Sequence, residues 1–395
     1  MKRWLVALGR AIPLRGSPGP GGLGMMAMLV GLLAFAACAA EEKASPTPAA
    51  PTAAAKPSPE EEWNRVVEAA KKEGKVVVAG PRSAPVRKGL SEPFEKRFGI
   101  SVEYQGMSGV ELASRVKAER TAGQYLWDVY IGAITAAVSD YKPIGGLDPL
   151  EPALILPEAT DPKSWFGNAL AFADKDRMLL QMLSYATEAF GINTKLMKAD
   201  EIKSYKDFLD PKWKGKILID DPRVGGPGQS KFHLFYVHKD LGASFIRALA
   251  EQKPVLLRDR EQALRWLAEG RYPVLLGVSK ASIISMKEAG APIDLVPPQQ
   301  MKEGGSLHMG TGGVALFNKA PHPSAAKVYI NWLLTKEGQT EFSRAIELPS
   351  RRLDVPKDMA EPWELPVQGF LSLDTEEAHK ARDDVAKLAT ELFGN

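Results

Sequence analysis

Cysteine and histidine are both scarce in this chain of 395 residues. Cys38 is the only cysteine, so no disulfide can form within the chain. The five histidines are His233, His238, His308, His322 and His379. The first two are five residues apart on an expected helix, which places them on different faces and does not match the ligand spacing of a zinc site. We therefore expect no resident metal and no cofactor.

Acidic residues are missing from the first 37 positions, where Lys2, Arg3, Arg10 and Arg15 precede an apolar stretch at 23–37. A basic start followed by a short apolar stretch and small residues is typical of a secretion signal. The apolar stretch is shorter than the roughly 20 residues that a membrane-spanning helix needs. Residues 1–37 are therefore predicted to be a signal peptide, and the protein is expected in the periplasm or on the outer face of the cytoplasmic membrane.

Cys38 directly follows two alanines, an arrangement that resembles the bacterial lipoprotein box, although Phe35 stands where leucine is usual. The resemblance implies that the Cys38 thiol is acylated and anchors the mature protein to a membrane. An ordinary signal peptide with a chance cysteine is the alternative. Residues 38–59 are rich in alanine and proline and contain no large apolar side chain, so they are predicted to be an extended tether.

Neither sign of charge dominates once residues 1–37 are removed, because 47 Lys and Arg then face 48 Asp and Glu, a formal net charge of −1. Proteins that bind nucleic acids depend on many basic side chains that neutralise phosphates. The chain has no such blocks, so we expect no nucleic-acid partner. We expect a monomer.

Several catalytic motifs are absent, among them Gly-x-Ser-x-Gly, the phosphate loop Gly-x-x-x-x-Gly-Lys-Ser/Thr and His-Glu-x-x-His. The pairs Ser114/Lys117 and Ser324/Lys327 match the Ser-x-x-Lys core of penicillin-recognising serine enzymes. That chemistry also needs Ser-Asp-Asn and Lys-Thr-Gly elements, and the chain contains neither. The prediction is a protein that is not an enzyme, with a serine hydrolase-type enzyme as a remote alternative.

Helices and strands alternate from about Glu60 onward. A helical pattern at 61–73 ends at Gly74, and a wholly apolar run at 75–80 follows, as in a strand that is covered on both faces. Further strands are expected at 100–104 and 128–132, each preceded by a helical pattern. This alternation predicts an α/β fold with largely parallel sheets. About 335 residues exceed what one core comfortably holds, so two lobes are expected.

The predicted boundaries follow changes of pattern along the chain. Residues 60–185 are expected to form the first part of lobe 1, and residues 186–298 are expected to form lobe 2. Residues 299–349 are expected to return to lobe 1, and residues 350–395 to form a C-terminal helical segment.

Four stretches resemble one known family, and they lie at 68–78, 94–102, 209–217 and 312–327. Their order and spacing are similar to those of the extracellular solute-binding proteins of ABC importers, specifically the ferric-iron-type group (family 1). The resemblance implies a two-lobed periplasmic binding protein of type II, with mixed, largely parallel sheets and a hinged cleft. It also implies a small-molecule or ion ligand held between the lobes and delivered to ABC permease subunits.

Candidate ligand-binding residues lie in loops after strands and at helix starts, where open α/β sheets bind ligands. These residues are Arg82, Ser83, Ser108, Gly109, Tyr185, Arg223, Gly225, Gly226, Ser279 and Lys280. Each serine or glycine could instead be a plain cap or turn, and each cation a solvated surface group. Tyr185 could be a half-buried aromatic residue whose hydroxyl bonds to the backbone.

Adjacent tyrosines are also missing, since none of the nine tyrosines neighbours another. Ferric members of the family commonly grip iron with two adjacent tyrosines. At the matching stretch, 275–282, this chain offers hydroxyls and the Lys280 ammonium instead. Such donors suit an anion, a carboxylate or a ferric complex with an anionic chelator. The alternatives for the whole protein are a ligand-sensing lipoprotein that feeds a receptor and a structural or adhesive surface protein.

Overall fold

The computed structural model describes residues 58–394, which belong to a single structural unit, Lys56–Asn395. The predicted signal peptide, Cys38 and nearly all of the predicted tether lie outside the described residues.

The first sheet joins segments from both ends of the described chain. Its strand order is β2-β1-β3-β13-β4, with β5 also paired to β13. Strand β1 is parallel to β2 and β3, whereas β13 is antiparallel to β3. The strands are β1 (Lys75–Gly80), β2 (Ser101–Gly106), β3 (Val129–Gly132), β4 (Leu147–Asp148), β5 (Leu180–Gln181) and β13 (Gly313–Phe317).

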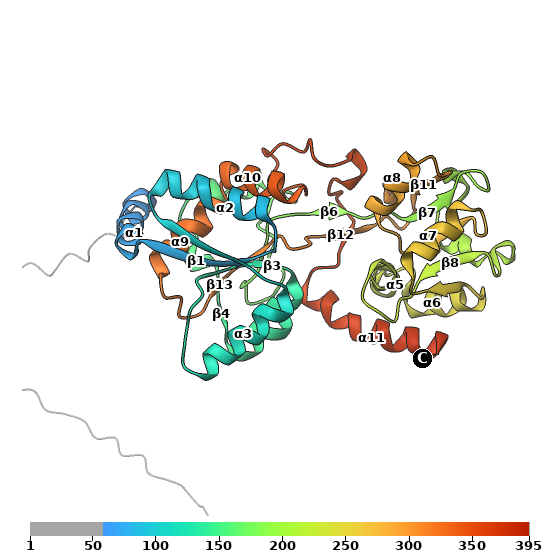
Figure 1. The fold of residues 1–395 in the computed structure, drawn as a ribbon, viewed down its shortest axis with the longest axis horizontal. Helices are drawn as coiled ribbons and strands as arrows, with labels where there is room; N and C mark the ends of the chain where they lie inside the picture. The colour runs from blue at the N-terminus through green and yellow to red at the C-terminus, as the bar shows by residue number, and fades with distance from the viewer. Residues whose placement is uncertain (1–57, 395) are drawn as a thin grey trace, which may run out of the picture. The chain divides into compact units, whose positions relative to one another are not determined.

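Five helices of eleven or more residues accompany this sheet: α1 (Pro59–Glu73), α2 (Ala84–Phe98), α3 (Gly109–Thr121), α9 (Pro323–Leu333) and α10 (Lys336–Ile346). Helix α1 starts where the Ser58 hydroxyl accepts from the Glu61 backbone N–H and the Glu61 carboxylate accepts from the Ser58 N–H. It ends at Gly74, whose φ of 77° lies in the left-handed region that favours glycine. Helix α1 packs on α9, and α2 packs on α10 (Figure 1).

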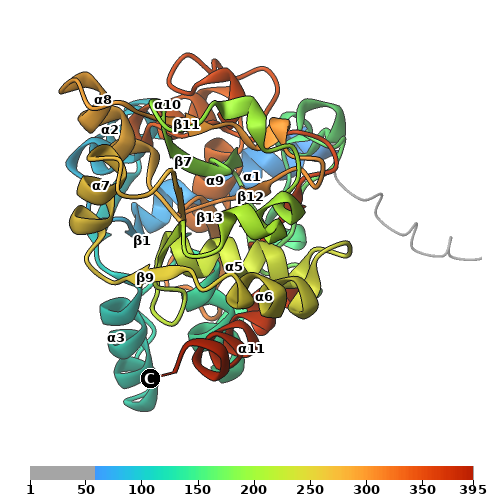
Figure 2. The ribbon, with the colours of Figure 1, turned by 90° about the vertical axis from the view of Figure 1, so that its right-hand side faces the viewer.

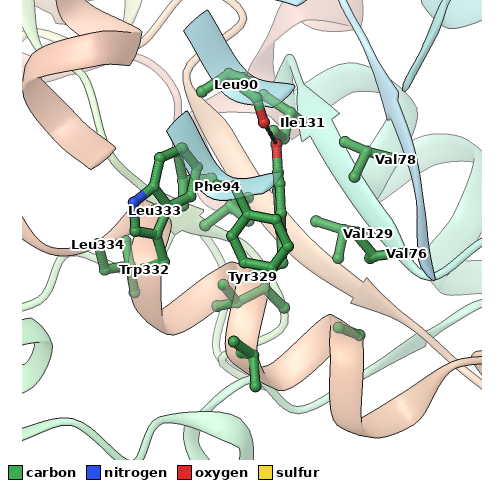
Figure 3. Close-up of a cluster of buried hydrophobic side chains, with 14 of the residues drawn as sticks. Val76, Val78, Leu90, Phe94, Val129, Ile131, Tyr329, Trp332, Leu333 and Leu334 are labelled. Atoms are coloured by element: carbon green, nitrogen blue, oxygen red, sulfur yellow. Dashed lines mark hydrogen bonds between the residues drawn. The ribbon is translucent and has the colours of Figure 1, made fainter. Parts of the chain in front are cut away.

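Aromatic side chains fill the core between α2 and α9. The ring of Phe94 lies 5.0 Å from that of Tyr329 and 5.4 Å from that of Trp332, measured between centroids. The Tyr329 hydroxyl donates a hydrogen bond of 3.0 Å to the Leu90 backbone oxygen. Figure 3 shows these rings against valines of β1 and β3, so the core joins helices α2 and α9 to the first sheet.

The second sheet has its own core and the order β11-β7-β10-β8-β9. Strand β7 is antiparallel to both neighbours, and β10, β8 and β9 are parallel, so this sheet is also mixed. Its strands are β7 (Phe190–Asn193), β8 (Ile217–Asp220), β9 (Val255–Leu257), β10 (Val274–Leu276) and β11 (Ile293–Val296). Its helices are α5 (Pro227–Val237), α6 (Gly242–Glu251), α7 (Arg260–Ala268), α8 (Lys280–Glu288) and α11 (Glu376–Phe393).

The C-terminal helix α11 packs against α5 and α6, as the views in Figures 1 and 2 both show. The chain therefore leaves the first sheet after α10 and ends beside the second.

A third, small sheet joins the two larger parts. It has the order β14-β12-β6, with β6 (Tyr185–Ala186), β12 (Ser306–His308) and β14 (Leu371–Ser372). Strands β6 and β12 are antiparallel, and His308 pairs with Tyr185. Strands β6 and β12 lie on segments that run between the two large sheets (Figure 1).

Short helical segments complete the described chain. They are Ala136–Tyr141, Lys142–Ile144, Glu151–Ala153, Pro157–Thr160, Pro162–Ser164, Ala199–Glu201, Tyr205–Leu209, Pro211–Trp213, Pro298–Gln300 and Pro362–Glu364. Between residues 58 and 394, no helix is both long and apolar enough to span a membrane. The expectation of an α/β fold is confirmed, and its sheets are mixed.

Candidate functional site

A cavity of about 540 Å³ lies beside the third sheet, and we call it the β6–β12 cavity. Its volume falls within the range of roughly 300–1,000 Å³ that is usual for small-molecule sites. Ten of the side chains that line it are polar or charged, and six of these are Tyr185, Glu188, Lys231, Lys280, His308 and Glu364. These six come from β6 and the short segment after it, from α5, α8 and β12, and from the segment after α10, so elements far apart in the sequence build one site.

Two glycines allow the end of β10 to meet the start of α5 at this cavity. Gly277 has a φ of 75°, and a side-chain carbon on it would lie 2.5 Å from the Cα of Gly228. Both the left-handed backbone and the close approach therefore require glycine at position 277. This contact brings Ser230 and Lys231 of α5 to the same cavity as Ser279 and Lys280.

Helix α8 begins at the cavity wall. Ser279 precedes its first turn without a capping hydrogen bond from its own side chain, and Lys280 is the first helical residue. The first N–H groups of a helix have no partner within it and favour a negative charge nearby. Lys280 pairs with the Glu364 carboxylate and lies 5.7 Å from the centre of the Trp363 ring. A carboxylate of the chain itself therefore pairs with the side chain of the first residue of α8.

Lys231 is almost fully buried on the α5 side of the cavity. Its ammonium donates a hydrogen bond of 2.7 Å to the backbone oxygen of Glu188. Burial lowers the pKa of Lys231 to about 8, although the nearby Glu188 charge opposes this shift. The lysine thereby holds the Glu188 backbone at the cavity wall.

Tyr185 and His308 face each other from paired strands, with ring centroids 6.0 Å apart. Burial raises the pKa of Tyr185 to about 12, so its hydroxyl remains protonated at neutral pH. Burial lowers the pKa of His308, whose Nε2 lies 3.0 Å from the Ser306 hydroxyl. Both rings are thus uncharged hydrogen-bonding groups at neutral pH.

The predicted residues of the first sheet lie elsewhere. Arg82 pairs with Glu111, and its side chain is 63% exposed. The hydroxyls of Ser83 and Ser108 cap α2 and α3, each accepting a backbone N–H at 3.3 Å. Gly109 lines a separate cavity of about 210 Å³ at the carboxyl ends of β1 and β3.

Arg223 faces away from the β6–β12 cavity. It forms two hydrogen bonds of 2.8 Å with the Asp221 carboxylate and donates to the backbone oxygens of Phe393 and Gly394. Gly225 accepts from Arg260 at 2.9 Å in the same loop, and Gly226 follows it just before α5. Of the predicted ligand-binding residues, the structure brings together Tyr185, Ser279 and Lys280 at this cavity.

Sequence reasoning missed Glu188, Lys231, His308 and Glu364. Glu188 stands three positions after Tyr185, so its place beside the predicted crossover is a signal that could have found it. No local sequence signal pointed to Lys231, His308 or Glu364. Lys231 is 43 residues from its partner Glu188, and Glu364 is 84 residues from its partner Lys280.

The two Ser-x-x-Lys matches are not assembled as catalytic pairs. The Ser114 hydroxyl donates to the Val110 backbone oxygen at 3.0 Å, and Lys117 pairs with Asp140 at 2.7 Å. Ser324 lies at the start of α9, where its N–H donates to Glu73. In the described part of the chain, no three side chains of His, Cys, Asp or Glu are grouped so as to hold a metal ion.

Comparison with known proteins places the chain in a family. The family model described as bacterial extracellular solute-binding protein matches residues 89–367, more than two thirds of the chain. The chain belongs to this family. The family is one of exported binding proteins rather than enzymes, which confirms the resemblance noted in the sequence.

A curated relative, an uncharacterized protein of Haemophilus influenzae, is 29% identical over 157 residues. The match covers 38% of this chain and 43% of the relative, so the chain spans less than half the length of that protein.

Solved structures of solute-binding proteins share the fold. An iron- and citrate-bound protein of Trichodesmium aligns over 82% of this chain and 100% of its own, with 18% identity and a TM-score of 0.61. The ferric iron-binding protein A of Mannheimia haemolytica, in an open conformation, covers 81% and 98%, with 17% identity and a TM-score of 0.61. An ABC transporter protein of Clostridium perfringens covers 80% and 99%, with 16% identity and a TM-score of 0.63.

Proposed function

We propose that this solute-binding protein is the extracytoplasmic subunit of an ABC importer, which captures a small solute in the β6–β12 cavity and delivers it to permease subunits. The observation that carries the proposal is the origin of the cavity lining. Tyr185 and His308 come from the connecting strands, Lys231 and Lys280 from helices of the second sheet, and Glu364 from the segment after α10. A solute that contacts the connecting strands, the helices of the second sheet and the segment after α10 at once stabilises the arrangement in which these three regions lie close together.

The solute's acidic group binds at Ser279 and Lys280 in this proposal. The Glu364 carboxylate pairs with Lys280 at the start of α8, which supports a carboxylate as the matching chemistry. The arriving acid would replace Glu364, so binding would release the segment that carries it. An organic acid, either free or as the chelator of ferric iron, fits this description.

The same proposal includes the membrane anchor of the protein and its division into two lobes. Acylated Cys38 would tether a monomer through residues 38–59. Residues 60–185 and 299–349 would move as one lobe against residues 186–298, with the C-terminal segment 350–395 beside the second sheet.

Thermal unfolding of the purified protein tests the binding function. We would record the melting midpoint with carboxylates, phosphate, sulfate and ferric iron, the last with and without citrate. A ligand that binds only the folded state raises the melting midpoint. At a ligand concentration of one hundred times its Kd, the free energy of unfolding increases by about 2.7 kcal/mol. The rise should be lost in Lys280→Met and kept in Lys216→Met, which removes an exposed lysine just before β8. A rise that survives Lys280→Met would contradict the assignment of this site.

A further inference from the structure

Glu188 is a buried carboxylate whose side chain is bonded by no other residue. Its exposed fraction is 8%, and the residue lines the β6–β12 cavity. Across residues 58–394, the only hydrogen bond to this carboxylate comes from the backbone N–H of Glu188 itself, and no basic side chain lies within 4.0 Å of it. The nearest lysine, Lys231, donates to the backbone oxygen of Glu188 instead.

An ionised carboxylate in such a place is costly. A charge that is withdrawn from water without a hydrogen-bonded partner loses several kcal/mol of solvation. Burial accordingly raises the pKa of Glu188, and the Lys231 charge only partly opposes this effect. A cationic donor that entered the cavity would restore both the hydrogen bonds and the charge balance.

The charges around the cavity point the same way. Glu188, Glu347 and Glu364 line it together with Lys231 and Lys280, so carboxylates outnumber ammonium groups by one. A solute with several negative charges would increase this excess, whereas a solute that carries an ammonium group would reduce it. The hydroxyl of Tyr185, which also lines the cavity, offers a further oxygen acceptor.

We infer that Glu188 receives an ammonium group of the solute, which makes the solute an amino acid in the broad chemical sense. Its amine meets Glu188, and its acidic group meets Lys280 and the first turn of α8. This assignment rests on the proposed function for the acidic half of the solute, whereas the Glu188 subsite stands on its own geometry.

Isothermal titration of the full chain with matched probes tests the subsite. The probes are unbranched ω-aminoalkanoates of three to six carbons, the alkanoates that lack the amine, and the alkylamines that lack the acid. We expect at least one aminoalkanoate to bind about tenfold or more tightly than its alkanoate, a difference of about 1.4 kcal/mol. In Glu188→Gln this ratio should fall to about one, with alkanoate affinity unchanged.

Glu288→Gln is the matched control, because it removes the same charge from an exposed side chain of α8 that does not line the cavity. The ratio should stay within about twofold of the wild-type value. Glu188→Asp supplies a second variant, in which the carboxylate retreats by one methylene. The preferred aminoalkanoate should then be one carbon longer.

Three results would overturn the subsite: every aminoalkanoate binds no tighter than its alkanoate, no aminoalkanoate binds at all, or Glu188→Gln leaves the ratio unchanged. Alkanoate binding without a preference for the amine would leave the proposed function standing. Alkylamines that bind as tightly as aminoalkanoates would instead support Glu188 and contradict the acidic subsite at Lys280.

Discussion

His233 Nε2 donates a hydrogen bond of 2.6 Å to the backbone oxygen of Ala378 and thereby ties helix α5 to the C-terminal helix α11. Burial is the main cause that lowers the pKa of His233 to about 4, whereas in the unfolded chain it is near 6.5. Between these values the unfolded state binds more protons than the folded state. Stability contributed by His233 is therefore present above pH 6.5 and is lost as the pH falls toward 4.

Urea unfolding at pH 7 and pH 5 measures this loss. The difference in free energy of unfolding between wild type and His233→Gln should change by about 2 kcal/mol between the two pH values, with wild type losing more at low pH. Glutamine retains a donor for the Ala378 backbone oxygen but does not titrate. The other histidines are present in both proteins, so their contributions cancel in the difference. The same difference at both pH values would contradict the prediction.

Asp221 is fully buried and accepts hydrogen bonds from Arg223 and Arg258, each from Nε at 2.8 Å. The Arg223 contact is the largest cause that holds the pKa of Asp221 well below its usual range. Asp221→Asn should lower the free energy of unfolding by about 3 kcal/mol, since a buried network then loses its charge. Chemical denaturation measures this change.

Arg223→Ala should also destabilise the protein, because its guanidinium reaches the backbone at the end of α11. We expect solute affinity to stay within about twofold, since Arg223 does not line the β6–β12 cavity. A large loss of solute affinity with an unchanged free energy of unfolding would show instead that Arg223 contributes to solute binding.

Tyr329 lies in the first core with its hydroxyl bonded to Leu90 (Figure 3). Tyr329→Phe keeps the ring and removes one buried hydrogen bond, so we expect a loss of about 1 kcal/mol. Phe94→Ala removes a whole ring from the same cluster and should cost about 3–5 kcal/mol through lost burial and the cavity left behind. Equal losses in the two variants, measured by urea unfolding, would contradict this account of the core.

Glu364 competes with the solute for Lys280 in the proposed mechanism. Its carboxylate also accepts from the Glu361 backbone N–H at 2.8 Å, which holds it in place beside the lysine. Glu364→Gln should therefore raise the affinity for an acidic solute by roughly threefold to tenfold, or about 1 kcal/mol. Titration calorimetry of the variant beside Glu361→Gln, whose side chain is exposed, separates this effect from a general change of charge. Weaker binding in Glu364→Gln would mean that Glu364 contacts the solute directly.

Local sequence patterns predicted much of the first sheet and its helices. Ser83 and Ser108 stand at the starts of α2 and α3, and Gly74 stands at the end of α1. These signals are legible in the sequence because caps, turns and apolar periodicity involve residues only a few positions apart. The likeness to solute-binding proteins, which four separate stretches carry, is confirmed by the family match.

The fold class, the family and the candidate loops at strand ends could be predicted from the sequence, because each depends on short-range order along the chain. Which of these loops share a cavity depends on the three-dimensional packing of the chain. Arg82 and Arg223 pair with carboxylates away from the β6–β12 cavity, whereas Lys280 pairs with Glu364, which is 84 residues away in the sequence. Such pairings depend on how helices and strands pack in space, and no local pattern encodes which charge a long, flexible side chain will meet.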